Sequence, residues 1–460
     1  MEAIFCLNSP QIDQYVGLIF FLFYTALFSV LIVKWRFFRV NGINRFLVLS
    51  VFYLKLLAGY ALYVVYNDHY QDRGTGDTFR FFDDATVMHR CFKEESFGSY
   101  MRLLTGIGIE EDEVALGYYM EMTHMERKYS SVYVNDNATM IRFNALLMQL
   151  SRGHYIVHIS FWCFMALMGL TALLKLLVAY FPRKRVAMFF SVFLLPTTLF
   201  WASGVLKEPI LLLGMGLFLL GFFRYIFEEW HFKHLIFILF GLILLILAKG
   251  YVLYLMSPAI LGLLLAKIFQ GRRFWLWFSL PHLAVVLLVV YSSVAGDPLD
   301  LIGKIAWKQE AFYNEAMLSE AGSIIEIPPI RSGWDLFLNA PQALLNTYLR
   351  PWLWEAKNFL YIPAALENLF LMFCLLFMLW NFRRPYGLGI PLIAFGISFC
   401  ILLGVVIGMV VPVQGALVRY KMPGLIFLFA MCFVLTDHIL LQRRLPFIRK
   451  FVRKLWRKPY

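Results

Sequence analysis

Charged residues are scarce in this chain of 460 residues, where Asp, Glu, Lys and Arg make up only 15% of the sequence. A soluble globular domain carries roughly 25% charged residues, so this composition excludes an ordinary soluble protein. The chain is also 61% hydrophobic and 18% aromatic. Because only helices and closed barrels span a bilayer, apolar stretches of this kind predict an all-α, polytopic integral membrane protein.

The sequence lacks the motifs by which many soluble enzymes are recognised. It contains no CxxC, HExxH, P-loop or GxSxG pattern, and His69, His89 and His124 have no metal-ligand spacing. No metal site is predicted, and a divalent cation (Mg²⁺ or Mn²⁺) stays open as a cofactor. There are only six cysteines, of which Cys6 and Cys91 would share the oxidising side of the membrane. Whether these two pair is left open.

Apolar stretches near the ~20 residues needed to cross a bilayer recur along the chain and predict about eleven spans. With no internal repeat or separate soluble region, they form a single transmembrane domain over residues 1–460. The stretch at Ala187 is short, and the pair around Lys249 also fits a single broken unit. The stretches begin near Tyr15, Phe46, Tyr155, Ala187, Pro209, Leu235, Tyr251, Trp275, Leu366, Leu388 and Gly424.

Lys and Arg are concentrated in short loops, which places those loops in the cytoplasm. The net charge of +13 belongs largely to this face. The basic tail 442–460 interleaves cations with Phe, Val, Leu and Trp, which suits a stretch lying on anionic lipid head groups and argues against a nucleic-acid partner. An odd number of spans puts the N-terminus outside and the C-terminus in the cytoplasm, and the first apolar segment is expected to be a retained anchor.

Two long loops remain on the extracytoplasmic side, over residues 67–153 and 292–361. Loops of this length generally carry structure or a function of their own. In the first loop, aromatic and Met residues recur through 113–122 and 140–148, enough for one amphipathic surface helix in each stretch. The second loop has a polar, Pro-broken half followed by an aromatic half.

The first loop carries an acidic motif shortly after the second span, with Asp77 in a Gly-Asp-Thr sequence and the pair Asp83 and Asp84 close behind. A carboxylate near the membrane surface can take a proton from an acceptor hydroxyl or help to hold a divalent cation. The alternative is a solvated loop in which Asp caps a helix. The run 110–113 is expected to be such an acidic helix start.

Lys207 and Glu208 stand at the start of a predicted span, after Ser203-Gly204 and directly before Pro209. Ionisable groups at membrane depth are costly, and their default interpretation is functional. Helix-start chemistry accounts for Glu208 and Pro209, but a cation is unfavourable at a helix N-terminus. Lys207 is therefore a candidate to bind an anion such as a lipid phosphate.

Five further charged residues lie at the outer ends of spans or in the adjoining loops. Taken singly, each has a plain explanation, such as a lysine that extends to the membrane interface or an arginine paired with a nearby carboxylate. Taken together, converging cations with a few carboxylates would form a site for phosphate and hydroxyl groups. The five residues are Lys249, Arg350, Glu355, Arg419 and Lys421.

In combination, these features resemble the C-type superfamily of membrane glycosyltransferases. The shared features are many spans, an acidic motif in an early extracytoplasmic loop, surface helices, a Ser-Gly-x-x-Lys-Glu step opening a middle span, and an Arg-Tyr-x-x-Pro motif before the last span. Asp77 matches the acidic residue of the family's early loop, with Asp83 or Asp84 as the neighbouring candidate, and Arg419 matches the phosphate-side arginine. The chain departs from the family pattern by starting outside, which puts an extra span before the acidic loop.

The resemblance implies an inverting transferase that moves a sugar from a polyprenyl-phosphate carrier in a bacterial inner membrane to an extracytoplasmic glycan or lipid acceptor. Asp77 would be the general base, Asp83 or Asp84 would assist, and Lys207 and Arg419 would neutralise the leaving phosphate, with Arg350 and Lys421 as further candidates. An alternative enzyme is an O-antigen-type polymerase or ligase that uses undecaprenyl-linked glycans. A transporter or flippase of a lipid-linked anionic substrate and a structural subunit of an envelope complex are alternatives of other classes.

Overall fold

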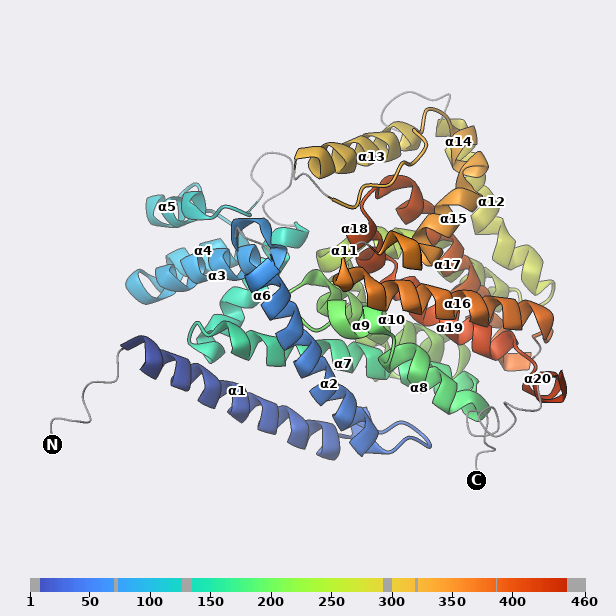
Figure 1. The fold of residues 1–460 in the computed structure, drawn as a ribbon, viewed down its shortest axis with the longest axis horizontal. Coiled ribbons are helices and arrows are strands. Elements are labelled where there is room, and N and C mark those ends of the chain that lie inside the picture. Colours follow the sequence, from blue (N-terminus) through green and yellow to red (C-terminus); the bar gives the residue numbers. More distant parts are fainter. Residues whose placement is uncertain are drawn as a thin grey trace. The chain divides into compact units, whose positions relative to one another are not determined.

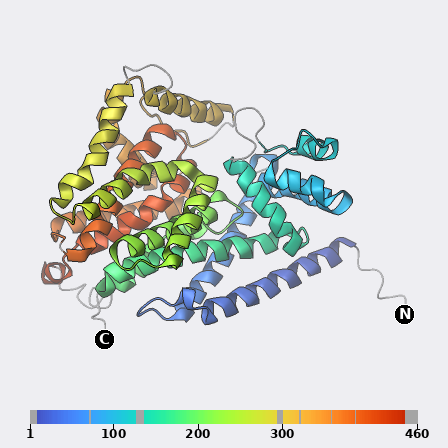
Figure 2. The ribbon, with the colours of Figure 1, turned by 180° about the vertical axis from the view of Figure 1, so that it is seen from behind.

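The computed structural model describes residues 9–69, 73–125, 135–292, 300–318, 322–356, 358–385 and 387–444. All the named elements of these residues are helices (Figure 1), and pairing of the strand type is limited to three isolated bridges. The same helices are seen from behind in Figure 2. The all-α prediction is confirmed.

Eight helices in the described residues are long and apolar enough to cross a membrane, and a ninth span results if one bent helix pair is counted as a unit. The protein is therefore a multi-pass membrane protein, while the predicted count of eleven spans is not confirmed. The eight helices are α1 (Ser9–Lys34), α2 (Arg45–Val64), α7 (Tyr155–Tyr180), α10 (Lys207–Phe227), α11 (Phe232–Ile268), α12 (Phe274–Ser292), α16 (Ile362–Trp380) and α17 (Ile390–Val410).

Two predicted spans are replaced by pairs of shorter helices. The stretch at Ala187 forms α8 (Arg185–Phe193) and α9 (Pro196–Trp201), because a proline disfavours helical conformation in the residue before it. The last span consists of α18 (Gln414–Tyr420) and α19 (Met422–Leu435), bent by 61°. Since α19 alone has 14 residues, it is shorter than the usual length of a membrane span.

Helix α11 is interrupted at Lys249, where the backbone leaves helical geometry (φ −153°, ψ 75°). Near the end of α11, the Lys267 Nζ lies 5.8 Å from the centre of the Phe227 ring, which precedes the helix. A straight helix of 37 residues would be about 55 Å long. The chain therefore reverses direction between Phe227 and Lys267, as expected for two apolar stretches joined at a break.

The chain divides into two compact units, which are described separately here. Unit 1 contains Met1–Leu173, Leu199–Gly221 and Leu235–Gly250, and unit 2 contains Leu174–Thr198, Phe222–His234 and Tyr251–Tyr460. No shift in composition marks this division in the sequence.

In unit 1, the first long loop folds into four helices: α3 (Asp77–Glu94), α4 (Phe97–Thr105), α5 (Glu113–Glu121) and α6 (Asp136–Ser151). The two helices predicted in this loop are present as α5 and α6. Asp112 caps α5 by accepting the backbone N–H groups of Val114 and Ala115. Buried Asn144 ties α6 to α7, because its Oδ1 lies 2.8 Å from His158 Nδ1 and accepts the Trp162 indole N–H at 3.1 Å.

The parts of α7 and α10 that belong to unit 1 approach each other at backbone distance. A Cβ atom on Gly216 would lie 2.1 Å from the carbonyl oxygen of Gly169, and one on Gly169 would lie 2.2 Å from the carbonyl oxygen of Leu212. Only glycine allows two helix backbones to come this close within a membrane protein. This crossing sets the position of α10 against α7.

In unit 2, α16, α17 and α19 lie alongside one another (Figure 1), and the second long loop contains α13 (Leu301–Leu318), α14 (Gly333–Leu338) and α15 (Ala340–Leu349). Helix α15 is fixed to α17 by the Tyr348 hydroxyl, which donates to the Cys400 carbonyl at 2.7 Å, and by the Thr347 hydroxyl, which donates to the Gly404 carbonyl. The remaining elements are η1 (Arg36–Phe38), η2 (Val65–His69), η3 (Arg73–Thr75), η4 (Pro182–Lys184), η5 (Leu353–Glu355), η6 (Phe359–Tyr361), η7 (Gly387–Gly389) and α20 (His438–Arg444).

Basic residues gather at one end of unit 2. The Lys184 Nζ donates to the carbonyls of Val434 and Thr436 at the end of α19, a favourable position for a cation. Burial there lowers the pKa of Lys184 to about 7. The Arg444 side chain donates to the Trp380 carbonyl at 2.6 Å. The side of the membrane on which the basic loops lie stays a prediction. The predicted basic tail lies outside the described residues from position 445 onward, as does Cys6, whereas Cys91 is buried.

Candidate functional site

Three helices of unit 1 begin close together, α3 at Asp77, α6 at Asp136 and α10 at Lys207. The Lys207 Nζ lies 2.7 Å from Asp136 Oδ2, and the His124 Nε2 lies 4.0 Å from Asp77 Oδ1. Helix N-termini carry partial positive charge, so three of them beside a lysine favour an anion. We call the charged and imidazole side chains here the outer cluster; they are Asp77, Arg80, His124, Asp136 and Lys207.

Apolar packing brings the predicted motifs of the outer cluster together. Leu62 and Tyr66, Phe79 of α3 and Leu206 form one buried group. A Cβ atom on Gly204 would lie 2.0 Å from the Leu62 side chain, so the glycine of the Ser-Gly step allows close approach to α2. This packing places the start of α10 near the start of α3.

Asp84 holds the turn that carries His124. Its side chain is buried, and its carboxylate accepts the backbone N–H groups of Thr123, His124 and Met125 at 2.9, 2.8 and 3.0 Å. Burial raises the pKa of Asp84, and the three N–H donors act in the opposite direction. With both oxygens occupied by the backbone, Asp84 is a positioning residue and not a free base.

His124 is neutral at physiological pH. Burial, with a smaller contribution from the Arg80 cation, lowers the pKa of its imidazole to about 4, and Asp77 acts in the opposite direction. The imidazole ring also contacts the Phe81 ring, with 5.1 Å between their centres. A neutral imidazole beside a carboxylate can accept or donate a proton in a hydrogen bond.

Asp83 points to a different partner from Asp77. Its carboxylate accepts two hydrogen bonds from the Arg73 guanidinium, at 2.7 and 2.9 Å, and both side chains are about half exposed. Arg73 neutralises this carboxylate. Of the three predicted acidic residues, only Asp77 belongs to the outer cluster, and 39% of its side chain is exposed.

Glu208 and Lys249 form a buried ion pair in unit 1, with 2.8 Å between Lys249 Nζ and Glu208 Oε1. Lys249 therefore does not extend to the membrane interface, and the non-helical backbone at this residue breaks α11 where its side chain meets α10. A buried pair of this kind is destabilising when only one partner is removed. Glu208 directly follows Lys207 of the outer cluster in the sequence.

A second group of predicted residues lies in unit 2. The Glu355 carboxylate accepts hydrogen bonds from the Arg350 guanidinium, from the Trp352 backbone N–H and from the Gln414 amide. The buried Lys421 Nζ donates to Asn368 Oδ1 at 2.6 Å and to the Arg350 carbonyl at 3.2 Å. We call this group the Arg350 cluster; it comprises Arg350, Glu355, Asn368, Gln414 and Lys421.

Arg419 lies in the last turn of α18, two residues before Lys421, and its side chain is half-buried. The neighbouring Tyr420 ring contacts Phe312 of α13, with 6.2 Å between ring centres. The predicted site residues thus form two groups, Asp77, Lys207, Glu208 and Lys249 in unit 1 and Arg350, Glu355, Arg419 and Lys421 in unit 2. That all of them form one site stays a prediction.

Several residues of these groups were not singled out from the sequence. His124 and Asp136 lie 47 and 59 positions after Asp77, and Asn368 lies 53 positions before Lys421. The one local signal is Asn135, which caps α6 and would mark Asp136 as a helix start. Among the described residues, no group of His, Cys, Asp or Glu has the arrangement of a metal site. Comparison with family models, curated proteins and solved structures finds no match.

Proposed function

We propose that this protein is a membrane glycosyltransferase that moves a sugar from a polyprenyl-phosphate donor to an acceptor on the extracytoplasmic side of a bacterial inner membrane. The observation that supports this proposal is the outer cluster, in which a partly exposed carboxylate, a neutral imidazole and a lysine lie close to the N-termini of three helices. The same arrangement offers a proton acceptor and an anion-binding surface, which are the two requirements of sugar transfer from a phosphate.

In the proposed reaction, the acceptor hydroxyl oxygen forms a bond to the anomeric carbon as the bond from that carbon to the phosphate oxygen breaks. The hydroxyl proton goes to the Asp77 carboxylate, and the bonding electron pair leaves with the phosphate. Attack opposite the leaving group inverts the configuration. His124 orients Asp77, and Lys207 stabilises the negative charge that develops on the phosphate.

An ion pair with Asp136 positions the Lys207 side chain for this role. The 2.7 Å ion pair offsets the unfavourable placement of a cation at the start of α10. As the bond to the anomeric carbon breaks, the phosphate gains a second negative charge and competes with one carboxylate for the ammonium group. In unit 2, Arg419 is assigned to substrate phosphate on its charge, whereas Arg350 is already neutralised by Glu355. The proposed orientation has the N-terminus outside and the C-terminus in the cytoplasm.

The test is transfer of radiolabelled sugar from a panel of polyprenyl-phosphate sugars to membrane acceptors, using the full chain in lipid nanodiscs. We expect wild type to transfer from at least one donor, and Asp77→Asn to lose about 10²–10⁴-fold in rate, the range for a general base. Equal rates for wild type and Asp77→Asn, or no transfer from any donor, would overturn the proposal. Size-exclusion profiles and thermal unfolding establish that the variant is folded.

One observation favours a second candidate function, transport of a lipid-linked substrate. The Lys55 side chain in α2 is fully buried, and its Nζ has no hydrogen-bond partner among the described residues. An ammonium group buried in a membrane helix is costly and often marks a transport pathway. If transport is the function, Lys55→Met abolishes movement of fluorescent polyprenyl-phosphate across proteoliposomes. In a transferase, the variant keeps its transfer rate.

A further inference from the structure

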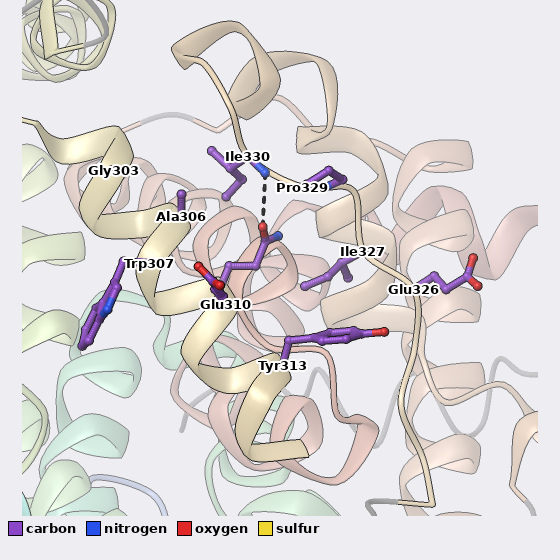
Figure 3. Close-up of a pocket in the computed structure, with 10 residues that line it drawn as sticks. Gly303, Ala306, Trp307, Glu310, Tyr313, Glu326, Ile327, Pro329 and Ile330 are labelled. Atoms are coloured by element: carbon purple, nitrogen blue, oxygen red, sulfur yellow. Dashed lines mark hydrogen bonds between the residues drawn. The ribbon is translucent and has the colours of Figure 1, made fainter. Parts of the chain in front are cut away.

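Unit 2 contains a groove between α13 and the extended segment 326–330 (Figure 3). Its volume is about 590 Å³, within the range of roughly 300–1,000 Å³ typical of small-molecule sites. Its residues belong to unit 2, whereas those of the outer cluster belong to unit 1. The lining residues are Gly303, Ala306, Trp307, Gln309, Glu310 and Tyr313 of α13, with Glu326, Ile327, Pro329 and Ile330 opposite.

The two walls of the groove are held together by Gln309. This buried side chain donates to the carbonyls of Pro328 and Met409 at 3.0 and 2.6 Å, and it accepts the Ile330 backbone N–H at 3.1 Å, the dashed line in Figure 3. Directly before the extended segment, the Ile325 N–H donates at 2.7 Å to the carbonyl of Pro412, which follows α17. The groove is therefore preformed, which reduces the entropic cost of binding.

The side chains that line the groove suit a sugar. Trp307 and Tyr313 lie on α13 with Glu310 between them, and the two aromatic side chains are 64% and 41% exposed. One face of a pyranose ring presents C–H groups that pack on an aromatic ring, and its hydroxyls donate to carboxylates. Glu310 and Glu326 provide such carboxylates on opposite walls. A purely apolar ligand would leave both of them desolvated.

The groove continues along α13 toward the start of the helix. A second cavity, of about 320 Å³, is lined by Asp300, Gly303, Lys304 and Trp307, so the two cavities share Gly303 and Trp307. The helix rises about 20 Å between Asp300 and Tyr313. A surface of this length accommodates several linked sugar rings and not only one.

The groove also adjoins the Arg-Tyr-Lys motif. Phe312, next to Tyr313 on α13, contacts the Tyr420 ring beside Arg419. Gln414 begins α18, and its backbone N–H donates to the Ser323 carbonyl, while its side chain donates to Glu355 of the Arg350 cluster. An oligosaccharide in the groove would thus lie near Arg419 and the Arg350 cluster.

We infer that the groove between α13 and segment 326–330 binds an oligosaccharide, with Trp307 and Tyr313 packing on sugar rings and Glu310 and Glu326 accepting hydrogen bonds from hydroxyls. The inference deepens the proposed function, on which it rests, by assigning the substrate class as an oligosaccharide chain. It therefore favours the polymerase or ligase form of the transferase over transfer to a small acceptor.

The test uses saturation-transfer NMR to measure binding of free tetrasaccharides to the full chain in nanodiscs. The tetrasaccharides are maltotetraose, cellotetraose and chitotetraose. We expect saturation transfer to at least one tetrasaccharide from wild type, and loss of at least tenfold in affinity for the double variant Trp307→Ala/Tyr313→Ala. Glu310→Gln should weaken binding without removing the aromatic contacts. The matched control is Trp334→Ala, because Trp334 is also an exposed tryptophan of this loop, 68% exposed, and does not line the groove.

Three outcomes would overturn the inference: no binding of any tetrasaccharide, unchanged binding by the double variant, or equal loss in Trp334→Ala. Saturation transfer to the nanodisc lipid alone would show that the aromatic residues face the membrane surface, and it also counts against a sugar site. Failure of the proposed function is distinguishable, since Asp77→Asn should retain tetrasaccharide binding. If the protein binds a tetrasaccharide but transfers no sugar, the inference about the groove stands and the proposed transferase function is wrong.

Discussion

Glu208 and Lys249 come from positions 41 residues apart and meet inside unit 1, with 2.8 Å between their charged atoms and almost no exposure of either side chain. Each stands at a helix discontinuity, Glu208 in the first turn of α10 and Lys249 at the break in α11. The pair therefore connects two spans at the point where neither has a complete set of helical hydrogen bonds.

Breaking this pair from one side should be costly. We expect Glu208→Gln and Lys249→Met each to lower the free energy of unfolding by about 3–5 kcal/mol, because each leaves a buried charge uncompensated. The double variant Glu208→Gln/Lys249→Met should recover most of this loss. Urea unfolding in detergent micelles measures the free energy of unfolding of wild type, the two single variants and the double variant. Additive losses in the double variant would show that the two side chains do not depend on each other.

The two partly exposed aspartates of α3 should differ in their effect on catalysis. Asp83→Asn should change the rate of sugar transfer less than threefold, because an exposed ion pair contributes only about 0–1 kcal/mol. Asp77→Asn should lower the rate by two orders of magnitude or more. Initial rates of both variants under the same donor and acceptor concentrations make the comparison. A larger loss of rate in Asp83→Asn than in Asp77→Asn would show that Asp77 is not the general base.

Removing the Asp84 carboxylate should loosen the turn at residues 123–125. Asp84→Ala leaves three backbone N–H groups without their acceptor, and a buried donor without a partner costs about 1–3 kcal/mol. We expect faster amide hydrogen exchange in this turn and a lower transfer rate, while exchange in α13 of unit 2 stays unchanged. Unaltered exchange at His124 would contradict the positioning role of Asp84.

His124 should make stability depend on pH. Its pKa is about 4 in the folded protein and near 6.5 in an unfolded chain, so the unfolded state takes up the proton first. The contribution of neutral His124 is complete above pH 6.5 and is lost as the pH falls toward 4, by about 3 kcal/mol in total. We expect the melting temperature of wild type to fall more between pH 7 and pH 4.5 than that of His124→Gln. If the melting temperatures of wild type and His124→Gln fall equally with pH, His124 is in a more solvated environment than the one described above.

Composition alone was sufficient for the class of fold, because only helices satisfy their backbone groups inside lipid without closing into a barrel. The sequence also located α5, α6 and the start of α10. The separate apolar stretches from Leu235 and Tyr251 anticipated the break at Lys249. The sequence did not locate the break at Leu195, since the apolar run continues across it and hydropathy does not report backbone conformation. The different roles of Asp77, Asp83 and Asp84 could not be predicted either. They depend on which partner each carboxylate meets, such as Arg73 or the turn at 123–125, and these partners become neighbours only through packing.

The glycines at which α7 and α10 cross have a consequence for genetics. A methyl group at Gly169 or Gly216 would force the two backbones apart, and Lys207 begins the helix that would move. Selections for loss of function should therefore recover alleles at these apolar interior positions, with the protein still inserted in the membrane. Because each methyl group would meet backbone atoms of the facing helix, a smaller neighbouring side chain would not restore the fit, and second-site suppressors should be rare at the crossing itself.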